Sequence, residues 1–254
     1  MGFWDNGLGE LVFPPLCHGC GDLLAAAEKP FCPPCVHKIP GLNLYRCSGC
    51  GTVKPDQTLT GQATKGWRCP SCIDKPLPWD FLFALGSYDG QLRDWILAQK
   101  GRRGEWFAEI LGRFFADFIP FPFQSLEKVD AVIPVPRHWT KRWWFGHNPA
   151  EGLARGLCGI KSWHLDRFPL FRTRPTARQS DLTPNQRKTN VKGAFAWRGR
   201  LQKNATALLV DDVYTTGATM MECSKTLKAA GFSQIAIAVL ALGKTRTTHP
   251  VRRG

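Results

Sequence analysis

The sequence lacks any apolar run long enough to span a membrane. Its longest strand-like apolar run, Ile235 to Leu242, has eight residues, whereas a membrane-spanning helix needs about 20. Near the amino terminus, Asp5 and Glu10 interrupt the apolar residues, so the uninterrupted stretch of a secretory signal is missing as well. These features predict a cytoplasmic protein with no membrane span.

Acidic residues are also scarce, because 20 Asp and Glu stand against 34 Lys and Arg, a formal net charge of +14. The excess is concentrated in residues 136–203, which hold 15 basic and 3 acidic side chains. Such a segment favours a polyanionic partner, either a phosphate-bearing metabolite or nucleic acid. A solvated basic surface is the alternative, and charge alone does not separate the two interpretations.

Cysteine, by contrast, is abundant and unevenly placed. Eight of the ten cysteines lie before residue 73, in the C-x-x-C pairs Cys17/Cys20, Cys32/Cys35, Cys47/Cys50 and Cys69/Cys72. A C-x-x-C turn directs two thiolates at one metal and two turns complete a tetrahedral shell, so the pattern predicts two structural Zn²⁺ sites. Pairing in sequence order is simpler than cross-bracing, which stays open. A disulfide framework is the alternative and needs an oxidising compartment.

The chain divides into two regions at about residue 78. Residues 1–78 are rich in Pro, Gly and Cys and are predicted to form a double Cys₄ zinc-ribbon domain. Residues 79–254 alternate strand and helix signals, which predicts an α/β domain with a mainly parallel sheet flanked by helices. Strands are expected at 81–88, 129–135, 207–210 and 235–242, and helices at 91–100, 105–118, 148–157 and 218–230. In the second of these helices Trp106 is expected on the apolar face.

Residues 207–219 carry the most informative motif. A buried strand is expected to end in Asp211 and Asp212, and a turn rich in Thr and Gly then leads into a helix. Backbone N–H groups of the turn and of the helix N-terminus can bind phosphate, while the two carboxylates can bind ribose hydroxyls and a divalent cation. An ordinary strand-turn-helix with capping threonines is the alternative. The candidate phosphate-binding residues are Val213, Tyr214, Thr215, Thr216, Gly217, Ala218 and Thr219.

A second candidate segment follows the predicted strand 129–135. This strand runs into a loop that begins at Arg137 and interleaves cations with aromatic rings, as single-stranded nucleic-acid-binding surfaces do. Packing of the tryptophans in the core or against the zinc ribbon is the alternative. The candidate nucleic-acid-binding residues are Trp139, Lys141, Arg142, Trp143 and Trp144.

The motif at 207–219 resembles the phosphoribosyl pyrophosphate (PRPP) motif of type I phosphoribosyltransferases, and nearly the whole chain resembles the ComF/GntX family of competence-related proteins. The resemblance is carried by Phe13-Pro-Pro-x-Cys-x-x-Cys20, the later cysteine pairs, the Val-Pro-Arg137 loop, the segment from Gln179 to Phe195, and Asp211-Asp212. One departure lies at 145–150, where many relatives have Arg-Gly-Phe-Asn-Gln-Ala and this chain has Phe-Gly-His-Asn-Pro-Ala.

The resemblance implies a type I phosphoribosyltransferase fold that binds PRPP with Mg²⁺. It implies Asp211, Asp212 and Arg137 as candidate catalytic residues, with Arg137 on the diphosphate. It also implies a mobile hood over about residues 172–195, whose candidate binding residues are Arg174, Gln179 and Arg187.

Two functions follow from the resemblance. The first is a protein that binds PRPP or ribose 5-phosphate and takes part in DNA uptake, by binding single-stranded DNA and proteins of the uptake machinery. The second is an active phosphoribosyltransferase of nucleotide metabolism or salvage with no DNA role. Thr215 occupies the position of the general base in purine-salvage relatives, and a threonine cannot act as a base at neutral pH. Other type I enzymes also lack that acid, so the enzyme question stays open.

Overall fold

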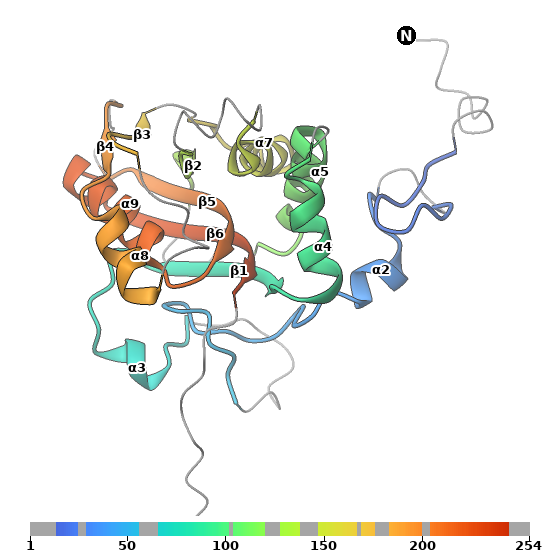
Figure 1. Ribbon diagram of the computed structural model, residues 1–254, viewed down its shortest axis with the longest axis horizontal. Helices are drawn as coiled ribbons and strands as arrows, with labels where there is room; N and C mark the ends of the chain where they lie inside the picture. Colours follow the sequence, from blue (N-terminus) through green and yellow to red (C-terminus); the bar gives the residue numbers. More distant parts are fainter. Residues whose placement is uncertain are drawn as a thin grey trace, which may run out of the picture.

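The computed structural model describes residues 14–24, 29–55, 66–101, 104–119, 128–137, 147–166, 169–175, 183–199 and 204–243. From residue 81 onward, strands and helices alternate as predicted (Figure 1). The main elements are β1 (Phe81–Ser87), α4 (Gly90–Ala98), α5 (Gly104–Ala116), β2 (Ala131–Pro134), α7 (Pro149–Lys161), β5 (Thr206–Tyr214), α9 (Ala218–Ala230) and β6 (Gln234–Leu242). No helix in these described ranges is long and apolar enough to cross a membrane.

A four-stranded sheet with the order β1-β6-β5-β2 forms the centre of the molecule. Every neighbouring pair of strands is parallel, so the predicted mainly parallel sheet is confirmed. Because side chains alternate along a strand, Leu208 and Val210 of β5 point to one apolar core and Leu209 points to the other. The continuous apolar runs of β5 and β6 therefore reflect burial on both faces of the sheet.

Helices cover both faces of this sheet (Figure 1). Helices α4, α5 and α7 enclose the core that contains Leu208, and α9 encloses the core that contains Leu209. Helices α5 and α7 approach each other closely because small residues line their contact. A Cβ atom added at Gly112 or Gly156 would collide with backbone atoms of the opposite helix.

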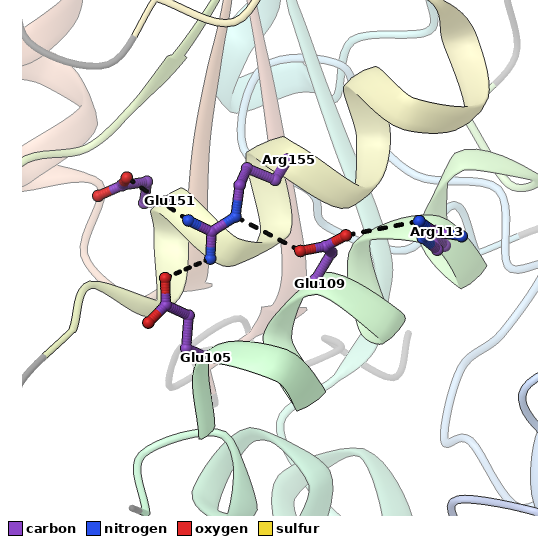
Figure 2. A network of polar contacts seen from close by, with 5 residues as sticks. All are labelled: Glu105, Glu109, Arg113, Glu151 and Arg155. Atoms are coloured by element: carbon purple, nitrogen blue, oxygen red, sulfur yellow. Dashed lines mark hydrogen bonds and ion pairs between the residues drawn. The ribbon is translucent and has the colours of Figure 1, made fainter. Parts of the chain in front are cut away.

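A network of charged side chains also joins α5 to α7 (Figure 2). Arg155 of α7 forms ion pairs with Glu105 and Glu109 of α5 and with Glu151 of its own helix. Glu109 continues the network to Arg113, at a distance of 3.5 Å. Since only about a fifth of the Arg155 side chain is exposed, this network holds the two helices in register at the edge of their apolar contact.

A small subdomain packs along α9. It contains the antiparallel strands β3 (Leu170–Arg172) and β4 (Phe195–Trp197), with the short helix α8 (Pro184–Val191) between them in sequence. Helix α8 begins with a capping box in which Thr183 and Gln186 satisfy each other's backbone N–H groups. These elements occupy the residue range in which the family resemblance implied a hood. Neither β3 nor β4 was predicted from the sequence.

Among the contacts between the cysteine-rich segments and the sheet domain, two involve buried tryptophans. In the first, the Phe31 ring stacks on Trp95 of α4, with ring centroids 4.0 Å apart. In the second, the Trp79 indole N–H donates a hydrogen bond to the Gly49 carbonyl at 3.0 Å. The segments contain the short helices α2 (Pro33–His37) and α3 (Pro70–Ile73), each of which begins directly after a cysteine of a C-x-x-C pair.

The prediction for Trp106 was wrong. The helix α5 forms and buries its apolar face, but Trp106 is 60% exposed. Its ring lies at the edge of that face and makes an edge-to-face contact with His18, with centroids 4.9 Å apart. Helical periodicity therefore identified the buried face of α5 but wrongly included Trp106 in it.

Candidate functional site

The phosphate loop, residues 214–217, connects β5 to α9. Gly217 caps the helix with φ = 73°, a left-handed conformation that favours glycine. A Cβ atom there would also collide with the Tyr214 hydroxyl, so glycine is required both by conformation and by space. The side-chain oxygen of Thr216 is buried without a hydrogen-bond partner among the described residues. The turn thus presents backbone N–H groups, a helix N-terminus and an unused hydroxyl.

The acid pair lies inside β5 rather than at its end, so this part of the prediction was wrong. Strand β5 continues to Tyr214 because its last residues keep their register with β6, where Asp211 pairs with Val239 and Tyr214 with Leu242. The strand thus carries both carboxylates up to the start of the phosphate loop. Backbone pairing with the long neighbouring strand β6 thus extends β5 beyond its apolar run.

The two carboxylates have different surroundings. Burial, together with the nearby charge of Asp212, raises the pKa of Asp211 to about 7. Asp211 accepts a hydrogen bond from the Asp212 backbone N–H at 2.9 Å. Asp212 forms an ion pair with Lys100, with 3.0 Å between Nζ and the carboxylate oxygen. The pair offers oxygen ligands of the kind Mg²⁺ prefers, and Lys100 supplies a cation at the same place.

The loop that begins at Arg137 follows the neighbouring strand β2. The two residues that join β2 to Arg137 are held from two sides, since Asn148 donates to the Val135 carbonyl at 3.0 Å and the Arg172 Nε donates to the Pro136 carbonyl at 2.9 Å. Burial lowers the pKa of Arg172. The negative charge of Asp211 acts to raise this pKa, and the positive charge of Arg137 acts to lower it. Arg137, Arg172 and Asp211 therefore lie within electrostatic reach of one another.

Lys100 and Arg172 were not identified as site residues from the sequence. Lys100 ends the predicted helix 91–100, and Arg172 marks the start of the implied hood. The only sequence feature that could have identified these two basic residues is their position at the boundary of a predicted segment. Their positions beside the acid pair and beside Arg137 depend on tertiary contacts.

Of the three candidate binding residues in the hood, the structure describes the side chain of Arg174 alone. Arg174 donates to the Lys192 carbonyl at 2.9 Å, so in this structure it stabilises the hood itself. Arg187 lies in α8, and its side chain is outside the described part of the structure. Gln179 lies outside the described residues altogether.

The proposed nucleic-acid segment cannot be placed in the same way. Its candidate residues, Trp139, Lys141, Arg142, Trp143 and Trp144, all lie outside the described residues. Their role in binding single-stranded DNA stays a prediction from the sequence.

The eight paired cysteines form two groups of four. Cys17, Cys20, Cys32 and Cys35 make one group, and Cys47, Cys50, Cys69 and Cys72 make the other. Within each group all the sulfur atoms lie within 4.8 Å of one another. Pairing in sequence order is therefore confirmed over cross-bracing, and all eight cysteines are free thiols rather than disulfides.

The backbone around each group favours a thiolate at its first cysteine, Cys17 or Cys47. Cys17 Sγ accepts hydrogen bonds from the backbone N–H groups of Gly19 and Cys32, at 3.3 and 3.2 Å. In the second group, a hydrogen bond from Cys50, supported by the Cys69 backbone N–H, lowers the pKa of Cys47 to about 4. Four converging sulfurs with N–H donors fit Zn²⁺ in a closed, structural shell.

Sequence comparison agrees with this geometry. The profile of the phosphoribosyl transferase domain matches residues 146–253, which include the hood, the acid pair and the phosphate loop. DNA utilization protein YhgH of Salmonella typhimurium is 28% identical over 230 residues, covering 89% of this chain and 96% of that protein. Competence protein F of Haemophilus influenzae is 28% identical over 225 residues, covering 82% of this chain and 96% of that protein. Residues 146–253 match the phosphoribosyl transferase domain, and most of the chain is similar to competence and DNA utilization proteins.

Solved structures similar to this chain include phosphoribosyltransferases. The purine phosphoribosyltransferase of Pyrococcus horikoshii Ot3 is 19% identical, with a TM-score of 0.31, and the match covers 67% of this chain and 83% of that one. A hypoxanthine phosphoribosyltransferase of Staphylococcus aureus is 12% identical, with a TM-score of 0.30, over 61% of this chain and 69% of that one. The fold assignment depends on the domain profile and on the parallel strand order.

Proposed function

We propose that this protein, as a member of the ComF family, binds PRPP or another ribose 5-phosphate together with Mg²⁺, and that it acts on single-stranded DNA during DNA uptake or utilisation. One observation carries the first half of the proposal. The paired carboxylates of β5 lead directly into a phosphate loop whose Thr216 hydroxyl is buried without a partner among the described residues. The names of the relatives, DNA utilization protein and Competence protein F, support the second half.

The residues divide the ligand between them. The backbone N–H groups of the loop, at the N-terminus of α9, would hold the 5′-phosphate. Asp211 and Asp212 would accept hydrogen bonds from the ribose hydroxyls, and they would hold Mg²⁺, which neutralises the diphosphate. Lys100 would leave Asp212 or turn toward the diphosphate when the cation binds, because both cations approach the same carboxylate.

Phosphoribosyl transfer is the second candidate function, and the pair of arginines favours it. Arg172 holds the Pro136 carbonyl and lies within electrostatic reach of Arg137, so two guanidinium groups can share the charge that develops on a leaving diphosphate. No carboxylate stands at Thr215 to act as a general base. The acceptor would therefore need to be a nucleophile that reacts without proton removal at that position.

The test of PRPP binding is isothermal titration calorimetry with the double variant Asp211→Asn/Asp212→Asn. We expect most PRPP and Mg²⁺ binding to be lost while the melting temperature stays close to that of the wild type. Unchanged PRPP affinity would contradict the site assignment. A PRPP-consumption assay across candidate acceptors, with and without single-stranded DNA, then separates the enzyme from the binding protein.

The DNA half of the proposal is tested on the aromatic segment. Replacing Trp143 and Trp144 with Ala should weaken single-stranded DNA binding by about 1–3 kcal/mol per stacked base that is lost, and it should leave PRPP binding unchanged. Affinity should fall with salt, with a slope of about −0.7 per phosphate contact. A stable variant that binds DNA like the wild type would exclude this segment as the DNA surface. A large loss of thermal stability would assign the tryptophans to the core.

The same proposal covers the metal, the domains and the location. We assign one structural Zn²⁺ to each group of four cysteines. We divide the chain into a zinc-binding unit, residues 1–78, and a phosphoribosyltransferase unit, residues 79–254. The protein would act in the cytoplasm, beside the machinery that delivers imported DNA strands.

A further inference from the structure

A cleft of about 470 Å³ lies between three segments that are distant in the sequence. The second cysteine group and the chain that follows it form one wall, the hood forms another, and the phosphate loop with the first turns of α9 forms the third. Its volume is in the range of pockets that bind small organic ligands. The cleft exists only because the cysteine-rich segment packs beside the phosphate loop.

This cleft shares the phosphate loop with the ribose-phosphate pocket but does not reach the acid pair. Of the described residues that line it, none is Asp211, Asp212, Lys100 or Arg137. It meets the phosphate loop from the side of the second cysteine group, through Thr216 and its neighbours. A ligand in the cleft would therefore lie next to bound PRPP without using the acid pair.

The rim of the cleft is positively charged. Lys75, Lys192 and Lys225 line it together with a single acid, Glu222. That acid is already engaged, because it pairs with Lys225 at 3.0 Å and accepts a hydrogen bond from the Gly193 N–H at 3.0 Å. Three lysines against this one acid leave the described lining of the cleft with a net positive charge, to which Lys75 and Lys192 contribute. They come from opposite walls, one beside the cysteine group and one from the hood.

The interior of the cleft combines apolar surface with hydroxyl-bearing residues, namely Thr189, Tyr214 and Thr216. Leu77, Trp79 and Met221 contribute apolar surface, and the Trp79 indole N–H is already bonded to the Gly49 carbonyl. The Thr216 hydroxyl oxygen is buried and has no partner among the described residues. A complementary ligand would combine an anionic group for the two lysines with a flat, mostly apolar group that also offers a hydrogen-bonding atom.

We propose that this cleft binds a nucleoside 5′-monophosphate unit, either a free nucleotide or the 5′-phosphorylated end of a single DNA strand. Lys75 and Lys192 receive the phosphate, and the base lies against Leu77 and Met221. The inference uses the proposed function only in assigning PRPP to the neighbouring acid pair. It places a nucleotide beside the ribose-phosphate pocket, on the side of the cysteine-rich segment.

The experiment titrates thymidine 5′-monophosphate (dTMP) into the full-length, zinc-loaded protein that has been saturated with PRPP and Mg²⁺. We expect dTMP to bind, and the variant Lys75→Gln/Lys192→Gln to lose about 10- to 100-fold in dTMP affinity while keeping its PRPP affinity. Lys38→Gln is the matched control, because Lys38 is exposed and does not line the cleft. Equal dTMP affinity in the double variant and the control, or no dTMP binding to the PRPP-saturated protein, would overturn the proposal.

Two further arms identify the source of the nucleotide and separate this proposal from the previous one. Single-stranded oligonucleotides with and without a 5′-phosphate are compared by fluorescence anisotropy. A gain from the 5′-phosphate that disappears in Lys75→Gln/Lys192→Gln assigns the cleft to strand ends, and binding of dTMP without such a gain assigns it to free nucleotides. If PRPP does not bind the wild type, the proposed function fails. The dTMP titration without PRPP, repeated in Asp211→Asn/Asp212→Asn, then decides the cleft alone.

Discussion

The raised pKa of Asp211 predicts that PRPP and Mg²⁺ bind more tightly as the pH rises through neutrality. Burial of the carboxyl, together with the charge of Asp212, raises its pKa to about 7. Only the ionised form can hold the cation and accept hydrogen bonds from both ribose hydroxyls. Protein at a pH below 7 must therefore lose a proton before it binds, and protein at a pH above 7 has already lost it.

The size of the effect follows from the ionised fraction. With a pKa of about 7, roughly a tenth of the Asp211 carboxyls are ionised at pH 6 and roughly nine-tenths at pH 8, so affinity should rise about tenfold between the two. The phosphate groups of the ligand also titrate near pH 6 and contribute their own slope. The comparison is therefore between the wild type and Asp211→Asn, which removes only the contribution of the protein.

Calorimetric titrations at pH 6, 7 and 8, at fixed free Mg²⁺, measure this difference. Asp211→Asn should bind more weakly than the wild type at pH 8 and should show a smaller rise with pH. Asp94→Asn, at an exposed position of α4, should behave like the wild type. If the wild type and Asp211→Asn showed the same pH slope, Asp211 would not be the group that titrates, and the argument from burial would be refuted.

Two other predictions concern stability and metal content. Cys69→Ser should reduce the zinc content by about one ion per chain, while the first cysteine group keeps its metal. The zinc content is measured by atomic emission on protein purified under reducing conditions. Wild-type protein without zinc would contradict the metal assignment. Gly156→Ala should lower the free energy of unfolding, measured by urea denaturation, by about 1–3 kcal/mol, because its Cβ would collide with the Glu109 carbonyl oxygen of α5. Gly159→Ala in the same helix is the control and should not destabilise the protein, because nothing lies within 4 Å of the added Cβ.

The sequence was most informative where a local pattern is enough to determine structure. Strand signals that alternate with helix signals predicted a mainly parallel sheet, and the apolar runs of β5 and β6 are buried on both of its faces. The spacing of the C-x-x-C pairs likewise predicted two groups of four thiols. In both cases each residue's neighbours in sequence supply most of the physical constraint.

The remaining features depend on contacts between distant segments. Lys100 meets Asp212, and Arg172 meets the Pro136 carbonyl, only after the sheet has brought their elements together. Strand β5 extends past its apolar run because β6 offers a partner for each added residue. The cleft beside the phosphate loop has no local signature at all, since its walls come from three separate parts of the chain.

The packing of Phe31 on Trp95 and of Gly49 on Trp79 has a practical consequence for anyone who shortens this protein. A chain that started at residue 79 would expose the Trp79 and Trp95 side chains, which are 2% and 3% exposed in the full structure. Such exposed aromatic surface promotes aggregation. The cysteine-rich segment therefore serves as an intramolecular cover for the sheet domain, and we expect a chain without it to be poorly soluble.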